Sequence, residues 1–350
     1  MQIGLVLGAG GHPGYPFQLV VLDAIERRLG IDLRDADLIV GTSVGAMTGL
    51  LLRAGFSVSD LLAIAHGDTP SADGHRLLHD VLDPPGQLPP DLPSWRPPSP
   101  RSTGAVASWR LLAGSGRRRH RIPAAAATLF PRGRASHEVF GRAANSLLDG
   151  VWPSRTTWVV AMRASDGHRT VFGRDTLASV PGDAVTASCA IPGWFNPVDV
   201  DGVMHVDAGV RSTTNADLLA DRRDLDLAII VAPLALTQPR TAMLDLPLRW
   251  LVNAQLRAEV ETLEAAGLET VVARPSGAVA RAMQGDPIRM SSQRVSRVLT
   301  ATAPWADAWA HEHLPAPLAA PSPARRAAPV SGPVAPLPAG RGVALAGAPA

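Results

Sequence analysis

The apolar positions near the start of the chain predict alternating strands and helices. Ile3–Leu7 is a continuous apolar run, which is typical of a short strand buried on both faces. From Phe17 to Leu29 the apolar residues instead recur at helical spacing, with Pro16 in the expected first turn and Gly30 at the expected end. The first fifty residues are therefore expected to form strand, helix, strand and helix, at 3–7, 17–29, 38–40 and 44–53.

The same alternation returns in the second half of the chain. The runs "TTWVVAMRA" and "RTVFG" predict two strands joined at the turn "SDGH", and Asp201-Gly202 is the expected turn of a further hairpin. Buried strands are expected within "DLDLAIIVAP" and "LETVVARP", and helices at 136–148, 248–266 and 295–310. Strands that alternate with helices predict an α/β fold around a mainly parallel central sheet.

Two segments interrupt this pattern. Residues 69–133 contain "DPPGQLPPDLPSWRPPSPRSTG" and the basic run "GSGRRRHR", whose composition cannot sustain a helix or a strand. We expect a partly disordered insertion there, and its apolar and arginine residues leave open a second interpretation as a lid or membrane-facing flap. Ala, Pro and Gly dominate residues 314–350 and predict a disordered tail, so residues 1–313 form the expected domain.

Composition narrows the class of protein. Apolar residues make up 46% of the 350 residues, enough for a substantial core, and the net charge of +2 gives no general argument for nucleic-acid binding. The single cysteine, Cys189, excludes an intramolecular disulfide and is expected to be a buried structural thiol. The N-terminus lacks the pattern of a signal peptide, and the most apolar run, at 38–52, is too short to cross a bilayer. We therefore expect a cytoplasmic protein.

The motif "GTSVG" carries the first candidate chemistry. Gly41, Ser43 and Gly45 fit G-x-S-x-G, in which a sharp turn between a strand and a helix projects the serine oxygen at the helix N-terminus. Small flanking residues avoid clashes in that turn, and the helix dipole favours an oxyanion. Because an apolar strand precedes the motif and an apolar helix follows it, Ser43 is the expected nucleophile of an acyl transfer.

No histidine is well placed in the sequence to complete a Ser-His-Asp triad. The histidines after Asp207 are His311 and His313, which lie at the edge of the predicted tail, and "HEH" lacks the spacing of a metal site. His205 falls in a predicted strand, where alternation places it on the same face as Asp207. The sequence therefore gives poor support to a triad or to a metal centre.

Three blocks in order along the chain resemble the patatin-like phospholipase family. They are the Gly-rich loop "GAGGHPG" after the first strand, "GTSVG" after the second, and "DAG" at Asp207, Ala208 and Gly209 after the hairpin. The phrases "ASCAIPGWFNPV" and "VDAGVRSTTNADL" also resemble the family, and the likeness spans about residues 3–299. The resemblance implies a three-layer α/β/α fold, with neither a cofactor nor a metal.

The resemblance also implies a reaction. Ser43 would attack a lipid ester carbonyl, and Asp207 would accept its proton without an intervening histidine, giving an acyl-enzyme that Asp207 then helps water to hydrolyse. The corresponding expectations are phospholipase A or lysophospholipase activity, a lipid or phospholipid substrate, and contact with a membrane surface. The implied oxyanion hole consists of N–H groups in the Gly-rich loop, at Gly8, Ala9, Gly10 and Gly11.

Two features depart from the family pattern. Many members carry Arg or Lys in the Gly-rich loop, where this chain has His12 and Pro13, and Pro13 has no N–H to offer. In addition, Ala208 replaces the usual first glycine after the aspartate. These departures leave a second interpretation open, in which the chain is a catalytically weak homologue that binds lipid or another partner.

Two further motifs have alternative interpretations. Gly8, Gly10 and Gly14 would suit a dinucleotide loop, but the following strand ends at Ser43, where such a loop needs an acidic residue. Asn215 would either order the loop after Asp207 or serve as the N-cap of a helix.

Overall fold

The computed structural model describes residues 1–81, 137–175, 179–236, 246–286 and 291–316. The strands of this part are β1 (Ile3–Leu7), β2 (Leu38–Thr42), β3 (Thr157–Arg163), β4 (Arg169–Phe172), β5 (Val198–Val200), β6 (Val203–Asp207), β7 (Leu227–Val231) and β8 (Glu269–Ala273). They form one sheet in the order β5-β6-β3-β2-β1-β7-β8, and β4 pairs with β3. From β3 through β2, β1 and β7 to β8 all neighbours are parallel, whereas β4, β5 and β6 pair antiparallel.

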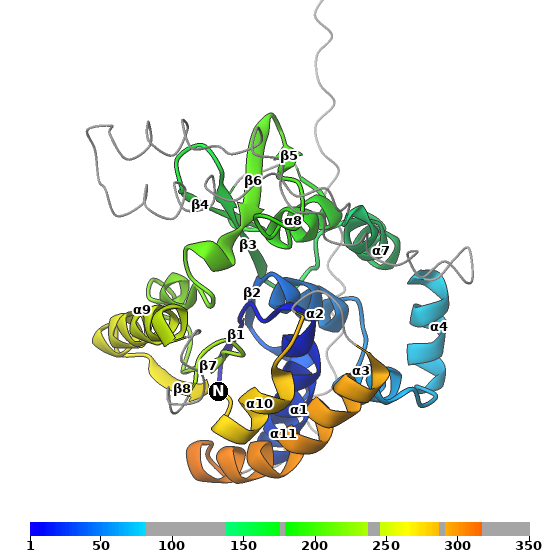
Figure 1. Cartoon of the computed structure of the whole chain (residues 1–350), viewed down its shortest axis with the longest axis vertical. Coiled ribbons are helices and arrows are strands. Elements are labelled where there is room, and N and C mark those ends of the chain that lie inside the picture. Colours follow the sequence, from blue (N-terminus) through cyan, green and yellow to red (C-terminus); the bar gives the residue numbers. More distant parts are fainter. Residues whose placement is uncertain (82–136, 176–178, 237–245, 287–290, 317–350) are drawn as a thin grey trace, which may run out of the picture.

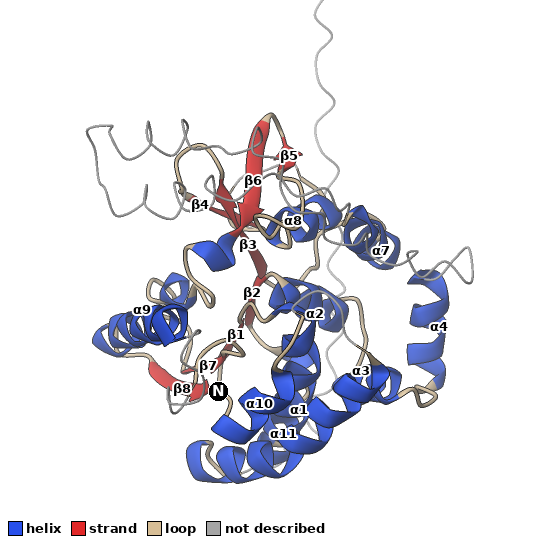
Figure 2. Ribbon diagram, in the orientation of Figure 1, coloured by secondary structure: helices blue, strands red, loops and turns tan. Residues whose placement is uncertain are grey.

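Helices cover both faces of this sheet. They are α1 (Gly11–Leu29), α2 (Val44–Arg53), α3 (Val58–His66), α4 (Ala72–Val81), α7 (Glu138–Leu148), α8 (Pro181–Ser188), α9 (Leu246–Ala265), α10 (Gly277–Met283) and α11 (Ser292–His313), with the short 3-10 helices η1 (Leu33–Asp35), η3 (Ala208–Val210) and η4 (Ala216–Leu219). Figures 1 and 2 show α1, α2, α3, α10 and α11 on one side of the sheet and α9 on the other. The predicted three-layer α/β/α architecture with a mainly parallel sheet is therefore confirmed.

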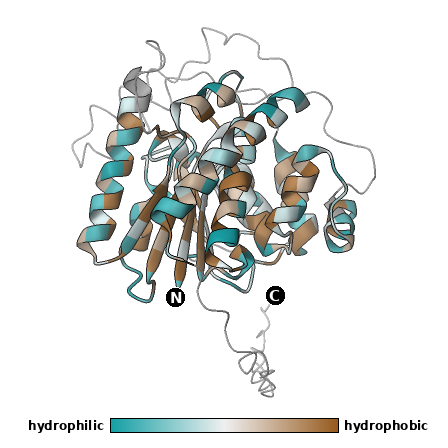
Figure 3. Cartoon of the chain, turned by 90° about the horizontal axis from the view of Figure 1, so that it is seen from below, coloured by the Kyte–Doolittle hydropathy of each residue, from teal (hydrophilic) through white to brown (hydrophobic). Residues whose placement is uncertain are grey.

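Alternate residues of β1 face the two helical layers. Leu5 and Leu7 are fully buried in a core shared with α1, α3 and α11, whereas Val6 is buried in a second core shared with η4 and α9. Burial on both faces is the reason why this strand is a continuous apolar run in the sequence. Figure 3 shows apolar strands in the interior and hydrophilic residues on the outer faces of the helices.

Most predicted elements are confirmed, including the hairpin turn, where Asp201 and Gly202 both have positive φ. One boundary is wrong, because α1 begins at Gly11 and so contains Pro16 in its interior rather than in its first turn. A helix can begin inside the loop because its first backbone N–H groups have no partner in any helix, so the missing donor of Pro13 costs little there.

Part of the expected insertion is a helix. Residues 72–81, at its start, form α4, which packs Leu77 and Leu78 against the larger core. Residues 82–133 of that insertion, and the tail from residue 317, lie outside the described residues. His311 and His313 form the last turn of α11 and not a tail. Within the described ranges, no helix combines the length and the apolar character that crossing a bilayer requires.

Candidate active site

Ser43 lies alone between the end of β2 and the start of α2, and its side chain is almost completely buried. Its backbone angles, φ 57° and ψ −125°, are ones that residues with side chains rarely adopt. A Cβ on Gly41 would lie 2.4 Å from the Cα of Ala46, and a Cβ on Gly45 would lie 2.0 Å from the carbonyl oxygen of Leu7. Both glycines are therefore sterically required by the sharp turn that presents Ser43.

A buried serine on α8 supports this turn. The N–H of Ser43 donates a hydrogen bond of 2.8 Å to Oγ of Ser188, and the Ser188 hydroxyl donates one of 2.7 Å to the carbonyl of Val160 in β3. The Ser43 N–H is consequently not available to an oxyanion. Nothing close to Ser188 in the sequence indicates this role, because the role depends on a contact with a residue 145 positions away.

Asp207 ends β6 and lies beside Ser43. Burial raises the pKa of Asp207 to about 6, although the Ser43 side chain and the Gly209 N–H, which donates to Oδ1 at 2.7 Å, both lower it. The backbone N–H of Asp207 donates to the carbonyl of Ala190, which fixes the end of the strand. The structure thus brings the two residues of the expected dyad together and gives the carboxyl a pKa close to neutrality.

The N–H groups of the first two residues of the Gly-rich loop already donate hydrogen bonds within the protein. The Gly8 N–H donates to the carbonyl of Val231 at 2.9 Å, and the Ala9 N–H donates to the carbonyl of Thr213 at 2.7 Å. Each of these hydrogen bonds joins the loop to a neighbouring segment. This pairing corrects the expected set of oxyanion donors, from which Gly8 and Ala9 are removed.

The following N–H groups begin α1 and point a helix N-terminus toward the site. Those of Gly10, Gly11 and His12 have no acceptor among the residues that the structure describes. Gly11 has a φ of 57°, which glycine adopts without strain. Free N–H groups at a helix N-terminus carry partial positive charge and favour an anion.

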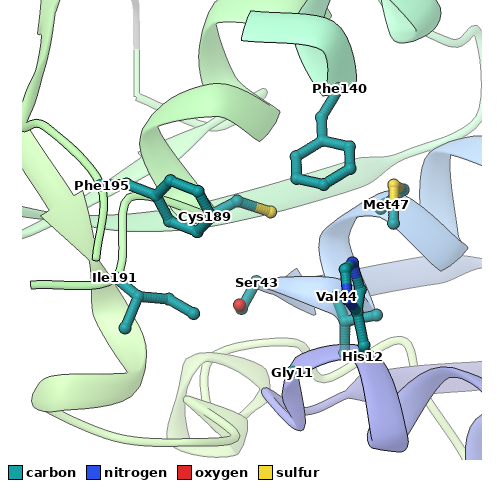
Figure 4. Close-up of a pocket in the computed structure, with 9 residues that line it drawn as sticks. All are labelled: Gly11, His12, Ser43, Val44, Met47, Phe140, Cys189, Ile191 and Phe195. Atoms are coloured by element: carbon teal, nitrogen blue, oxygen red, sulfur yellow. The ribbon is translucent and has the colours of Figure 1, made fainter. Parts of the chain in front are cut away.

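A pocket opens at Ser43, and Figure 4 shows the serine hydroxyl among the side chains that line it. The lining residues are Gly11, His12, Ser43, Val44, Met47, Phe140, Cys189, Ile191 and Phe195. Burial lowers the pKa of His12 below its ordinary 6.5, so the imidazole is neutral at neutral pH. Burial and the charge of Asp207 raise the pKa of Cys189, so its thiol stays protonated. The lining is therefore apolar and uncharged at neutral pH.

Other candidates from the sequence lie elsewhere. The ring of His205 contacts the hydroxyl of Thr170 through Nε2 at 2.9 Å and does not line the pocket, so His205 does not complete a Ser-His-Asp triad. Asn215 has no side-chain capping bond on η4, and its Nδ2 instead donates to Oγ1 of Thr42 and to the carbonyl of Ser212. Asn215 therefore orders the loop after Asp207, the first of its two interpretations. The described part of the chain holds no group of three His, Cys, Asp or Glu side chains suited to a metal.

One further polar side chain organises the site. Gln18 of α1 is fully buried, donates from Nε2 to the carbonyl of Gly8 at 2.7 Å, and accepts at Oε1 from the hydroxyl of Thr48 at 2.8 Å. It thereby ties the Gly-rich loop to α2, the helix that follows Ser43. The signal available in the sequence was a glutamine among the apolar positions of a predicted helix.

The chain was compared with protein-family models, curated sequences and solved structures. A family model described as patatin-like phospholipase matches residues 5–220, which include all three motif blocks. The crystal structure of VipD from Legionella pneumophila aligns with a TM-score of 0.43 and 13% identity, over 89% of this chain and 67% of that chain. The type III effector protein ExoU aligns with a TM-score of 0.39 and 15% identity, over 89% of this chain and 53% of that chain. Among curated protein sequences, none matches.

Proposed function

Because this chain belongs to the patatin-like phospholipase family, we propose that it is a lipid acyl hydrolase of the phospholipase A or lysophospholipase type, with Ser43 as nucleophile and Asp207 as proton acceptor. The observation that carries the proposal is the pairing of a serine held at positive φ with a buried carboxyl whose pKa is about 6. An ordinary aspartate is a weak base toward a hydroxyl, and a pKa raised toward neutrality improves that match.

The proposed reaction has two halves. The Ser43 hydroxyl gives its proton to the Asp207 carboxylate while its oxygen bonds to the ester carbonyl carbon. The tetrahedral intermediate expels the alcohol, which takes the proton from Asp207, and the acyl group stays on Ser43. Water then attacks the acyl-enzyme and passes a proton to Asp207. Collapse of the second intermediate releases the carboxylic acid and returns the proton to the Ser43 oxygen.

The oxyanion of both intermediates would accept hydrogen bonds from the N–H groups of Gly10, Gly11 and His12. These groups are free among the described residues, and they stand at the N-terminus of α1, whose dipole favours negative charge. The apolar lining of the pocket, with Met47, Phe140 and Phe195, suits the hydrocarbon part of a lipid ester. No metal or cofactor is needed for these steps.

A panel of phospholipids, lysophospholipids and neutral esters, tested on the wild type beside Ser43→Ala, examines the proposal. We expect turnover of at least one lipid class, its loss in Ser43→Ala and Asp207→Asn, and normal turnover in the matched control Ser59→Ala, which changes an exposed serine. A fluorophosphonate probe should label the wild type and not Ser43→Ala. Absence of both labelling and turnover, together with binding to lipid vesicles, would favour the alternative of a lipid-binding homologue.

A further inference from the structure

Glu259 of α9 is a buried carboxylate for which the proposed reaction has no use. Its side chain is 7% exposed, and it lies beyond the residues that the family model matches. Oε1 accepts a hydrogen bond from the Ser212 hydroxyl, and Oε2 accepts one from the Thr214 hydroxyl and one of 3.0 Å from the Ala216 N–H. All three donors belong to the segment that follows Asp207, so a single side chain holds that segment against α9.

This segment is in contact with the Gly-rich loop. The carbonyl of Thr213 accepts the N–H of Ala9 at 2.7 Å, next to the proposed oxyanion donors. A Cβ on Gly209 would lie only 3.2 Å from the Cβ of Ala9, so the turn after Asp207 also packs against the loop. A shift of the segment would therefore move the loop relative to Asp207.

The same segment is in contact with the strand that leads to the nucleophile. Nδ2 of Asn215 donates to Oγ1 of Thr42 at 3.1 Å, one residue before Ser43. The backbone N–H of Asn215 in turn donates to Oγ of Ser212 at 2.9 Å. The Gly-rich loop and the turn at Ser43 thus contact Thr213 and Asn215, which alternate along the chain with the three residues that Glu259 bonds.

The hydrogen-bond inventory at Ser212 requires an acceptor at position 259. Oγ of Ser212 already accepts the N–H groups of Thr214 and Asn215, so its one proton must be donated elsewhere, and Glu259 receives it. A glutamine amide would place N–H donors toward Ser212 or toward Thr214 and Ala216, where donors already point. The site therefore accepts a carboxylate and rejects the amide of the same shape.

From this arrangement we infer that Glu259 is a positioning residue for the acyl transfer. It acts through Ser212, Thr214 and Ala216. These residues hold Asp207, the Gly-rich loop and Ser43 at fixed positions relative to one another. The inference rests on the proposed function. Burying a carboxylate costs free energy, and the three hydrogen bonds from the segment after Asp207 offset that cost.

The test compares Glu259→Gln with Glu261→Gln and Glu264→Gln, which remove exposed carboxylates from the same helix. Steady-state hydrolysis of a soluble ester such as p-nitrophenyl butyrate gives kcat and KM, and thermal unfolding verifies that each variant is folded. We expect kcat of Glu259→Gln to fall about 10²-fold, because small displacements of reacting groups have effects of that size. KM should change little, since substrate binding is not altered, and both control variants should match the wild type. A kcat equal to that of the controls would overturn the inference.

Two further variants, Ser212→Ala and Ser43→Ala, test the inference if Glu259→Gln does not fold or if the proposed function is wrong. If Glu259→Gln does not fold, Ser212→Ala retains the carboxylate and removes one of its donors, and it should lower kcat with KM preserved. A folded Ser212→Ala with wild-type kcat would then overturn the inference. Ser43→Ala separates two kinds of failure. If Ser43→Ala is fully active, the proposed function is wrong and the inference falls with it, whereas an inactive Ser43→Ala beside a fully active Glu259→Gln refutes the inference alone.

Discussion

The backbone N–H of Ser43 and the hydroxyl of Ser188 form a buried hydrogen bond of 2.8 Å between residues 145 positions apart. Ser188 is fully buried and donates in turn to the carbonyl of Val160, so the end of α8 and strand β3 both support the turn at Ser43. Because a residue at positive φ is unfavourable by about 1–3 kcal/mol, it persists only where its surroundings determine it. Ser188 is part of that surrounding support.

Replacement of Ser188 by alanine should therefore weaken both the fold and the site. It leaves the Ser43 N–H and the Val160 carbonyl buried without partners, and each lost partner costs about 1–3 kcal/mol. We expect the free energy of unfolding to fall by about 2 kcal/mol or more in urea denaturation, together with a lower kcat. The exposed Ser59→Ala should change neither quantity. An unaltered stability in Ser188→Ala would mean that the hydrogen bond contributes nothing to the turn.

The raised pKa of Asp207 predicts how the rate depends on pH. The carboxylate is the proton acceptor in the proposed reaction, and its pKa is about 6. A plot of kcat/KM against pH, measured with a soluble ester, should rise through about pH 6 and level off above it. A rising limb at the pKa of an ordinary aspartate, near 3.8, would show that Asp207 is not the desolvated base proposed here.

The same burial should make ionised Asp207 unfavourable for the folded state. The pKa is about 6 in the folded protein against 3.8 ordinarily, so the folded state binds the proton more tightly than the unfolded state. Protonated Asp207 therefore stabilises the folded state. Its contribution to the free energy of unfolding, about 3 kcal/mol, is complete below about pH 3.8 and is lost as the pH rises through about 6.

Asp207→Asn should consequently be inactive and more stable than the wild type at neutral pH. Its Oδ1 can still accept the Gly209 N–H, and it carries no charge to bury. The free energy of unfolding should rise by up to about 3 kcal/mol above pH 7, and the gain should vanish near pH 4. Chemical denaturation at both pH values measures this, and a variant less stable than the wild type at neutral pH would contradict the prediction.

Gly45 is the glycine of the serine turn with the least space. A Cβ there would lie 2.0 Å from the Leu7 carbonyl oxygen, which belongs to the backbone of β1 and cannot rotate away. Gly45→Ala should lower the free energy of unfolding by about 3 kcal/mol. Gly14→Ala is the control, because the nearest atom to its Cβ, on Pro233, is 3.3 Å away. Equal stabilities of the two variants would argue against the close packing of α2 on β1.

The proposed oxyanion donors are backbone groups, so the imidazole of His12 should be dispensable. His12→Ala keeps its N–H and should retain kcat within about tenfold, whereas Gly11→Ala forces a side chain onto a φ of 57° and should lower kcat by about 10²-fold. Fluorophosphonate labelling rates provide a second measurement. The reverse order of effects would show that the imidazole itself takes part in the reaction.

Local features of the sequence predicted the sheet and the expected nucleophile. The apolar run of β1 reports burial on both faces, and the spacing of Gly41, Ser43 and Gly45 reports a sharp turn, although the backbone that limits Gly45 is that of Leu7 in β1. Asp207 was identified instead through the resemblance of the short motif after the hairpin to the family pattern.

The supporting residues could not be predicted in this way. Ser188, Gln18 and Glu259 form hydrogen bonds with other segments of the chain, at separations of 145, 10 and 43 positions, and nothing in their immediate neighbours reports those partners. The assignment of Gly8 and Ala9 as oxyanion donors was wrong for the same reason, since the carbonyls that occupy their N–H groups come from residues more than 200 positions later. Pairing across the fold decides which polar groups remain free.

The position of β1 in the sheet has a consequence for how the chain can be divided. β1 pairs with β2 on one side and with β7 on the other, and β7 follows the end of the matched region at residue 220. A fragment that ended at residue 220 would contain all three sequence motifs. It would lack β7, so β1 would become an exposed edge strand that can pair with a second molecule. It would also strip the Gly8 N–H of its partner, Val231. The region that identifies the family is therefore shorter than the region that the fold requires.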